Sequence, residues 1–198
     1  MNPLLVQLLA ASPPLSTAVD HPVDCCAGCG QSADPDDYQQ IAGGGPLCLI
    51  CRLGYLAAWQ PERVRLALIP ELHQGALNAV VIRMRVTLLE RQDRAQPIPG
   101  PAAPPAAEIM RQHHLMTLLQ QRVADTHRLI PFTVSPYLLR QTLLALPDAT
   151  RESLLAELAG LRYLPDPDDR EVDRFCLWQL HPWDQTPVLE SNNEPSTR

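Results

Sequence analysis

The pattern of apolar positions in the first half of the chain predicts two short helices and one strand. An Asn-Pro pair opens residues 4–9, where leucines at helical spacing give one apolar face. A second helix is expected over residues 48–59, with a proline two positions later to end it. Residues 80–90 (VVIRMRVTLLE) alternate over nine positions, which predicts a strand with one face on a core.

The second half has the apolar spacing of helices. Segments 108–124, 136–146, 149–159 and 170–180 each place apolar residues three or four positions apart. A Ser-Pro pair opens the second of these segments, as expected at a helix start. Residues 129–134 are expected to be a short extended piece.

A proline-rich segment separates the two halves. Residues 96–107 hold five prolines in 12 positions, which predicts a linker of polyproline character. The expected fold class is α+β, with a zinc-finger and strand module over residues 1–95 and a mainly helical module over 108–183. The tail over residues 184–198 is expected to be flexible.

Composition limits the class of protein. The 198 residues are 45% apolar and only 5% aromatic, so the core must be built from aliphatic side chains. Apolar runs stay short of the ~20 residues that a membrane span needs, and the start lacks the basic segment of a secretory signal. The expected location is cytoplasmic, where six cysteines favour metal binding over disulfides.

Two C-x2-C pairs are the strongest chemical motif. Cys26 and Cys29, followed by Gly30, lie 18 residues before Cys48 and Cys51. The spacing predicts one Zn²⁺ held by four thiolates, in a treble-clef-like finger whose second pair opens a helix. Four cysteine ligands leave no open coordination position, so the zinc would be structural.

Two other cysteines are assigned different places. Cys25 stands next to Cys26 and is an alternative ligand in a C-x3-C spacing. Cys176 lies on the apolar face of a predicted helix and is expected in the core.

Charge is distributed unevenly along the chain. The net charge is −6, and all 16 basic residues are arginine. Residues 1–51 carry five acids and no arginine, residues 52–146 carry 11 arginines and six acids, and residues 147–198 carry five arginines and 11 acids. The middle band could therefore meet phosphate, or it could be a solvated face paired with local glutamates. The candidate nucleic-acid-binding residues are Arg52, Arg63, Arg65, Arg83 and Arg85.

The order of elements resembles a known family. The chain has, in order, a short helix, the first cysteine pair with its glycine, a loop, a helix opened by the second pair, a basic middle and a helical end. This order is similar to that of the zinc-finger large subunits of type IV CRISPR effector complexes. The resemblance implies a non-catalytic subunit of a ribonucleoprotein complex that contacts guide RNA and the motif beside the target DNA. It also implies that the four paired cysteines hold zinc.

Other functions stay open at this point. One is a zinc-finger adaptor or accessory protein of a bacterial mobile element that binds protein partners only, which suits the acidic ends. Another is a zinc-dependent transcription regulator with a helix-turn-helix over residues 136–160, although only Arg140 and Arg151 are basic there. The chain lacks the hydrolase, nucleotide-binding and metalloprotease motifs, so an enzyme is not expected.

Overall fold

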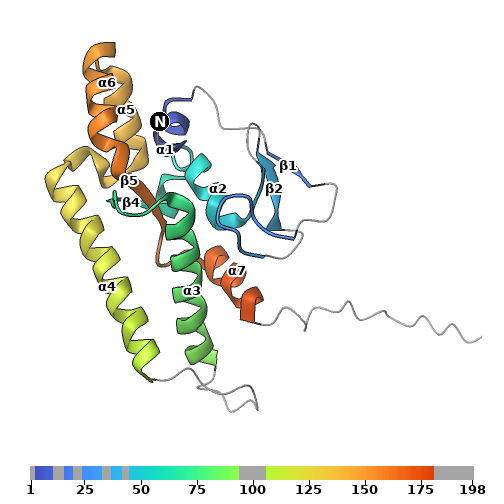
Figure 1. The fold of residues 1–198 in the computed structure, drawn as a ribbon. Helices are drawn as coiled ribbons and strands as arrows, with labels where there is room; N and C mark the ends of the chain where they lie inside the picture. The colour runs from blue at the N-terminus through green and yellow to red at the C-terminus, as the bar shows by residue number, and fades with distance from the viewer. Residues whose placement is uncertain are drawn as a thin grey trace, which may run out of the picture.

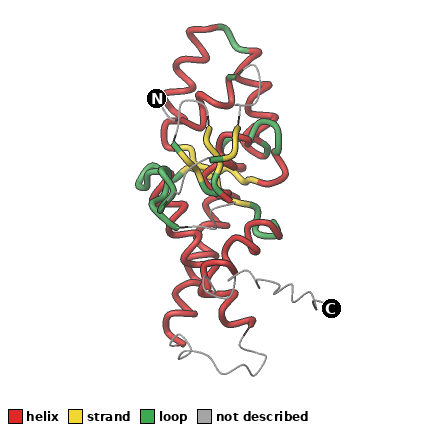
Figure 2. The backbone as a smooth tube through the Cα atoms, turned by 90° about the vertical axis from the view of Figure 1, so that its right-hand side faces the viewer, coloured by secondary structure: helices red, strands yellow, loops and turns green. Residues whose placement is uncertain are grey.

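A computed structural model describes most of the chain as a mixed α/β structure. Its described residues form seven α-helices and two small antiparallel sheets (Figures 1 and 2). The described residues are 3–10, 16–19, 24–32, 37–41, 45–93 and 106–180.

The N-terminal region combines two short helices with a three-stranded sheet. The helices are α1 (Pro3–Leu9) and α2 (Leu49–Leu56), and both confirm the predicted helices. The sheet has the order β1 (Ser16–Ala18), β2 (Gln39–Ile41) and β3 (Pro46–Leu47). Strands β2 and β3 form an antiparallel hairpin between the two cysteine pairs. The predicted hairpin or loop at this place is therefore a hairpin.

A second sheet joins distant parts of the chain. Strand β4 (Val64–Leu68) pairs with β5 (Leu161–Pro165) in antiparallel register, with Leu66 opposite Tyr163. Successive side chains point to opposite faces of a strand, so each strand serves two buried clusters. Leu66 packs in the larger cluster with α1, α2, α5 and α7, whereas Ala67 packs in the smaller one with α3 and α4.

The strand predicted over residues 80–90 is wrong, because this segment lies inside α3 (Gln74–Asp93). The alternation arises because the helix is buried on two sides. Val81 and Met84 pack in the smaller cluster beside α4, and Ile82 packs in the larger cluster. Two buried stripes on one helix imitate period two over a short window.

The other helices occupy the second half of the chain. They are α4 (Ala106–Leu129), α5 (Pro136–Ala145), α6 (Asp148–Glu157) and α7 (Arg170–Leu180), and they confirm the four predicted helices. In Figure 1, α5 and α6 form a pair at one end, and α3 runs beside α4 and α7.

Three short 3₁₀ turns complete the described structure: η2 (Pro61–Arg63), η3 (Pro131–Val134) and η4 (Leu158–Gly160). The extended piece predicted over 129–134 is wrong, because the Thr133 N–H and hydroxyl both donate to the Ile130 carbonyl and close a turn.

Some predicted segments lie outside the described residues. These are most of the linker over 96–107 and the tail over 184–198. Among the helices that the structure describes, none combines the length and apolar character needed to cross a membrane.

Candidate metal centre

The four paired cysteines meet in one cluster, although the pairs are separated in sequence. Cys26 and Cys29 lie in the loop before the β2–β3 hairpin, and Cys48 and Cys51 lie at the start of α2. Their four sulfur atoms all lie within 4.8 Å of one another. The cluster could therefore hold a metal ion, as the C-x2-C spacing predicts.

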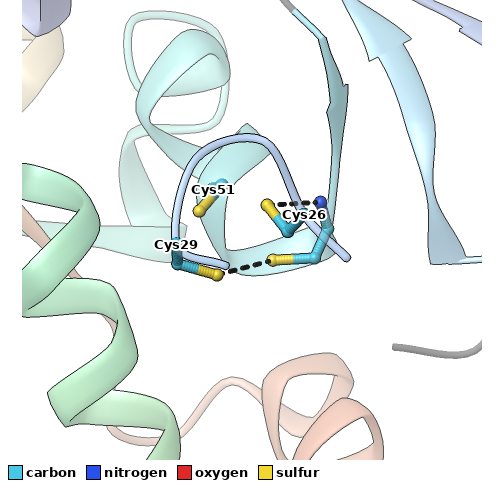
Figure 3. Close-up of side chains that lie close together, drawn as sticks. Cys26, Cys29 and Cys51 are labelled. Atoms are coloured by element: carbon cyan, nitrogen blue, oxygen red, sulfur yellow. Dashed lines mark hydrogen bonds between the residues drawn. The ribbon is translucent and has the colours of Figure 1, made fainter. Parts of the chain in front are cut away.

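The backbone of the first cysteine pair turns tightly around the sulfur atoms. The Gly28 and Cys48 N–H groups each donate to the Cys26 sulfur at 3.3 Å. Gly30 has a φ of 73°, a conformation that glycine adopts without strain, and its N–H donates to the Cys26 carbonyl at 2.8 Å. Figure 3 shows the sulfurs of Cys26, Cys29 and Cys51 directed toward a common space between the loop and α2.

The sulfurs are too close to be deprotonated together without a cation. Hydrogen bonds from Cys29, Cys48 and Cys51 lower the pKa of Cys26. Hydrogen bonding with the Cys26, Cys29 and Cys51 sulfurs, followed by burial, raises the pKa of Cys48. A bound divalent ion would offset the mutual repulsion of the thiolates, because it stabilises all four of them at once.

Helix α3 closes the cluster on the side away from the hairpin. A Cβ placed on Gly75 would lie 2.1 Å from the Gly28 carbonyl oxygen, so only glycine permits this approach. One turn further, the buried Asn78 amide donates to the Cys51 sulfur at 3.2 Å. Asn78 was not among the predicted site residues, because it precedes the predicted strand over residues 80–90 and no motif connects it with the cysteines.

The remaining cysteines lie apart from the cluster. Cys25 is exposed, and its sulfur is not among the four that gather. Cys176 is fully buried on α7, which confirms its place in the core, and burial raises its pKa to about 12. The structure therefore brings Cys26, rather than Cys25, into the cluster.

Three of the five predicted nucleic-acid-binding arginines form ion pairs with the acidic C-terminal part of the chain. Arg63 Nε donates to Asp169 Oδ2 at 2.8 Å, and Arg63 Nη2 lies 2.7 Å from Glu171 Oε2. Arg65 Nε donates to Asp166 Oδ2 at 2.6 Å. We call this set, with the pair described next, the arginine–aspartate junction.

The buried member of the junction is Arg85 on α3. Its side chain is 5% exposed; Nη1 donates to Asp173 Oδ1 at 2.7 Å, and Nη2 donates to the Asp166 carbonyl at 2.6 Å. Because α3 is a helix, Arg83 and Arg85 do not share a face, contrary to the strand interpretation.

The other two predicted arginines differ from each other. Arg52 on α2 is 9% exposed, and its Nε has no hydrogen-bond partner among the described residues. Arg83 is exposed on α3, and within the described part of the chain no ion pair involves it. The five arginines therefore do not gather on one exposed surface.

Comparison with known proteins adds no family to this description. No family model matches the chain, and no curated protein matches its sequence.

Proposed function

We propose that the chain is a non-catalytic cytoplasmic protein that binds one structural Zn²⁺ ion and assembles with protein partners. The observation that carries the zinc assignment is the gathering of four cysteine sulfurs within 4.8 Å. Zinc with four ligands at ~2.3 Å places its sulfurs about 3.8 Å apart along each tetrahedral edge. The Cys29 and Cys48 sulfurs are 3.8 Å apart, which suits this ion.

The order of the surrounding elements also supports a finger. A cysteine loop, the β2–β3 hairpin and a helix opened by the second cysteine pair follow the plan of a treble-clef-like finger. Four thiolate ligands complete the tetrahedron, so no position would remain for a substrate or a catalytic water. The zinc would hold the loop of the first cysteine pair to the start of α2.

Assembly with proteins is favoured over nucleic-acid binding by what the surface offers. Arg63, Arg65 and Arg85 donate to carboxylates of the same chain, so their charge is already compensated. Apolar side chains are about half exposed on η3 and on α5 beside it. They are Val134, Tyr137, Leu138 and Leu144. Exposed tyrosine and leucine near one another are typical of protein contacts.

A second proposal follows from the family resemblance. The chain would then be a subunit of a CRISPR ribonucleoprotein complex, in contact with guide RNA and target DNA. The exposed Arg83 is the observation in its favour, because its guanidinium is available to a phosphate.

Purification of the full chain with its co-expressed neighbouring genes tests both proposals. We expect about one zinc ion per chain, and a protein partner that is lost from the double variant Tyr137→Ser with Leu138→Ser but kept by Arg83→Ala. A low ratio of absorbance at 260 nm to 280 nm would accompany this result. RNA of uniform length that co-purifies with the wild type and is depleted from Arg83→Ala would favour the second proposal instead.

A further inference from the structure

A hydrogen-bond network of two side-chain amides leads from strand β5 to the cysteine cluster. Gln74 and Asn78 lie one turn apart on α3, and Tyr163 lies on β5 opposite them. Gln74 is half-buried, whereas Asn78 is 1% exposed and Tyr163 is 4% exposed, so the polar side-chain atoms of Asn78 and Tyr163 need partners inside the protein.

A backbone group fixes the orientation of the first amide. The Tyr163 N–H can only donate, and it donates to Gln74 Oε1 at 3.0 Å. The Gln74 Nε2 group must therefore face the other way, where it donates to the Tyr163 carbonyl and to Asn78 Oδ1, both at 2.9 Å. The oxygen of Asn78 is thus committed as an acceptor.

The second amide then has only donors left for the metal centre. Asn78 Nδ2 donates to the Cys51 sulfur at 3.2 Å and to the Tyr163 hydroxyl at 2.9 Å. The Tyr163 hydroxyl is directed to the Ile50 and Cys51 carbonyls of α2 at 3.2 and 3.0 Å. A phenol is protonated at neutral pH, so the hydroxyl has one hydrogen to donate to these carbonyls. Every N–H and O–H hydrogen of these three side chains is donated to an acceptor inside the protein, and the acceptor at the end of the network is the Cys51 sulfur.

The same side chains border an opening beside the cluster. A cleft of about 180 Å³ is lined by Cys51, Asn78 and Tyr163, with Leu4, Gly28 and Gly75 among its other walls. Cys51 is the member of the four-cysteine cluster that lines this cleft. A chelator or a proton approaching through the cleft would meet Cys51, whose sulfur accepts the Asn78 amide hydrogen bond.

We propose that Asn78 is a positioning residue of the metal centre, which holds the Cys51 thiolate by a fixed N–H donor and slows loss of the metal toward the cleft. This inference rests on the proposed zinc site. A hydrogen bond to a metal-bound thiolate lowers the electron density on sulfur, so it disfavours protonation and orients the ligand. Outer partners of metal ligands typically change metal affinity by about tenfold or more.

The test compares zinc-loaded full-length chains. Asn78→Leu removes the donor, and Asn78→Asp keeps the shape but turns an oxygen toward sulfur. Tyr163→Phe is the matched control, because it perturbs the same buried network yet leaves the Asn78 donor to sulfur. Two quantities are measured: the rate of zinc transfer to a coloured chelator, and the energy of the sulfur-to-metal charge-transfer band after substitution with Co²⁺.

We expect both Asn78 variants to transfer zinc about tenfold faster than the wild type, with the charge-transfer band at lower energy. Tyr163→Phe should keep the wild-type band. If Asn78→Leu does not fold, Asn78→Ala decides, because alanine offers the sulfur no donor. Zinc transfer and a band equal to those of the wild type in Asn78→Ala would overturn the role of Asn78 alone. A wild-type chain that takes up no zinc would overturn the proposed function beneath it.

Discussion

The four-cysteine cluster and the arginine–aspartate junction both gather ionisable side chains, but over very different distances in sequence. The cysteines all lie between residues 26 and 51, in two local pairs. In the junction, Arg63 meets Asp169 from 106 positions away, and Arg85 meets Asp173 from 88 positions away. Local spacing makes the first site visible in the sequence, whereas the second exists only after α3, β4 and α7 have packed.

The two regions also differ in what holds them. Four thiolates this close would need a cation to offset their charge, so the stability of the cysteine cluster would depend on the proposed zinc ion. The junction contains its own carboxylates as counter-charges, so it needs no added ion. Substitutions in the cluster should therefore act on folding as a whole, and those in the junction should act in smaller steps.

The largest effect is expected from Cys48→Ser. Structural zinc can contribute about 10 kcal/mol or more to a small fold, and a missing thiolate weakens the site that holds it. The variant should be insoluble or protease-sensitive, with little zinc by atomic emission. Cys25→Ser and Cys176→Ser are matched controls outside the cluster and should retain one zinc per chain. Full zinc content in soluble Cys48→Ser would contradict the metal site.

Removal of Arg85 should have the next largest effect. Arg85→Ala takes away two hydrogen bonds of a buried guanidinium, leaves the Asp173 carboxylate without its arginine donor and leaves the Asp166 carbonyl with the Asp169 N–H alone. We expect a loss of about 2–3 kcal/mol in the free energy of unfolding, measured by urea denaturation. Arg83→Ala, on the exposed side of the same helix, should change it by less than about 0.5 kcal/mol.

A double-mutant cycle sharpens this comparison. Arg85→Ala combined with Asp173→Asn should cost less than the sum of the single changes, because each alone removes the same ion pair. Strict additivity would mean that the pair contributes nothing of its own.

The Arg63–Asp169 pair predicts a pH dependence. Burial raises the pKa of Asp169, but hydrogen bonding with Arg63 and its positive charge outweigh burial, so the folded-state pKa lies below the ordinary value of 3.8. A lowered folded pKa stabilises the protein above the unfolded pKa and loses this contribution as pH falls through the folded value.

Asp169→Asn isolates the charge. The Asp169 carboxylate also accepts the Glu171 and Val172 N–H groups at the start of α7, a role that an asparagine oxygen can keep. The wild type should be more stable than Asp169→Asn by about 1 kcal/mol at pH 7, and the difference should shrink below about pH 4. Parallel unfolding curves at pH 7 and pH 3 decide this, and a constant difference would remove the ion pair as its cause.

The contrast between local contacts in the cysteine cluster and distant contacts in the junction explains which parts of the molecule could be predicted from the sequence. The helices of the second half were predicted correctly because each has one apolar stripe and a marked start, such as Ser135, whose hydroxyl accepts the Tyr137 N–H at 3.2 Å. The gathering of the four cysteines was predicted correctly because two-residue spacings set the local geometry of each pair. Both are local properties of the chain.

The errors and omissions come from partners far away in sequence. Helix α3 was mistaken for a strand because α4 and α7 cover two of its sides, which no window of ten residues reveals. Strand β5 was not predicted because its five residues acquire their pairing from β4, about 100 positions earlier. Asn78 was missed for the same reason, since its contacts with Cys51 and Tyr163 depend on α3 being a helix.

The smallest expected effect concerns Arg83 and separates the two proposed functions. The sequence alone suggested that Arg83 and Arg85 meet phosphates side by side, but Arg85 is buried in the junction and, of these two, Arg83 is exposed.

If the chain binds duplex DNA in an assembled complex, Arg83→Ala should reduce the slope of log K against log salt by about 0.9, the value for one phosphate. The variant should keep its zinc and its stability, so a change in slope would report phosphate contact and not unfolding. Binding is measured at four or more salt concentrations, with Arg122→Ala as the control. Arg122 lies on the exposed surface of α4 and is already paired with Glu71 at 3.1 Å. An unchanged slope in Arg83→Ala would mean that none of the five candidate arginines is available to a phosphate. Assembly with protein partners through the exposed face of α5 would then be favoured over contact with nucleic acid.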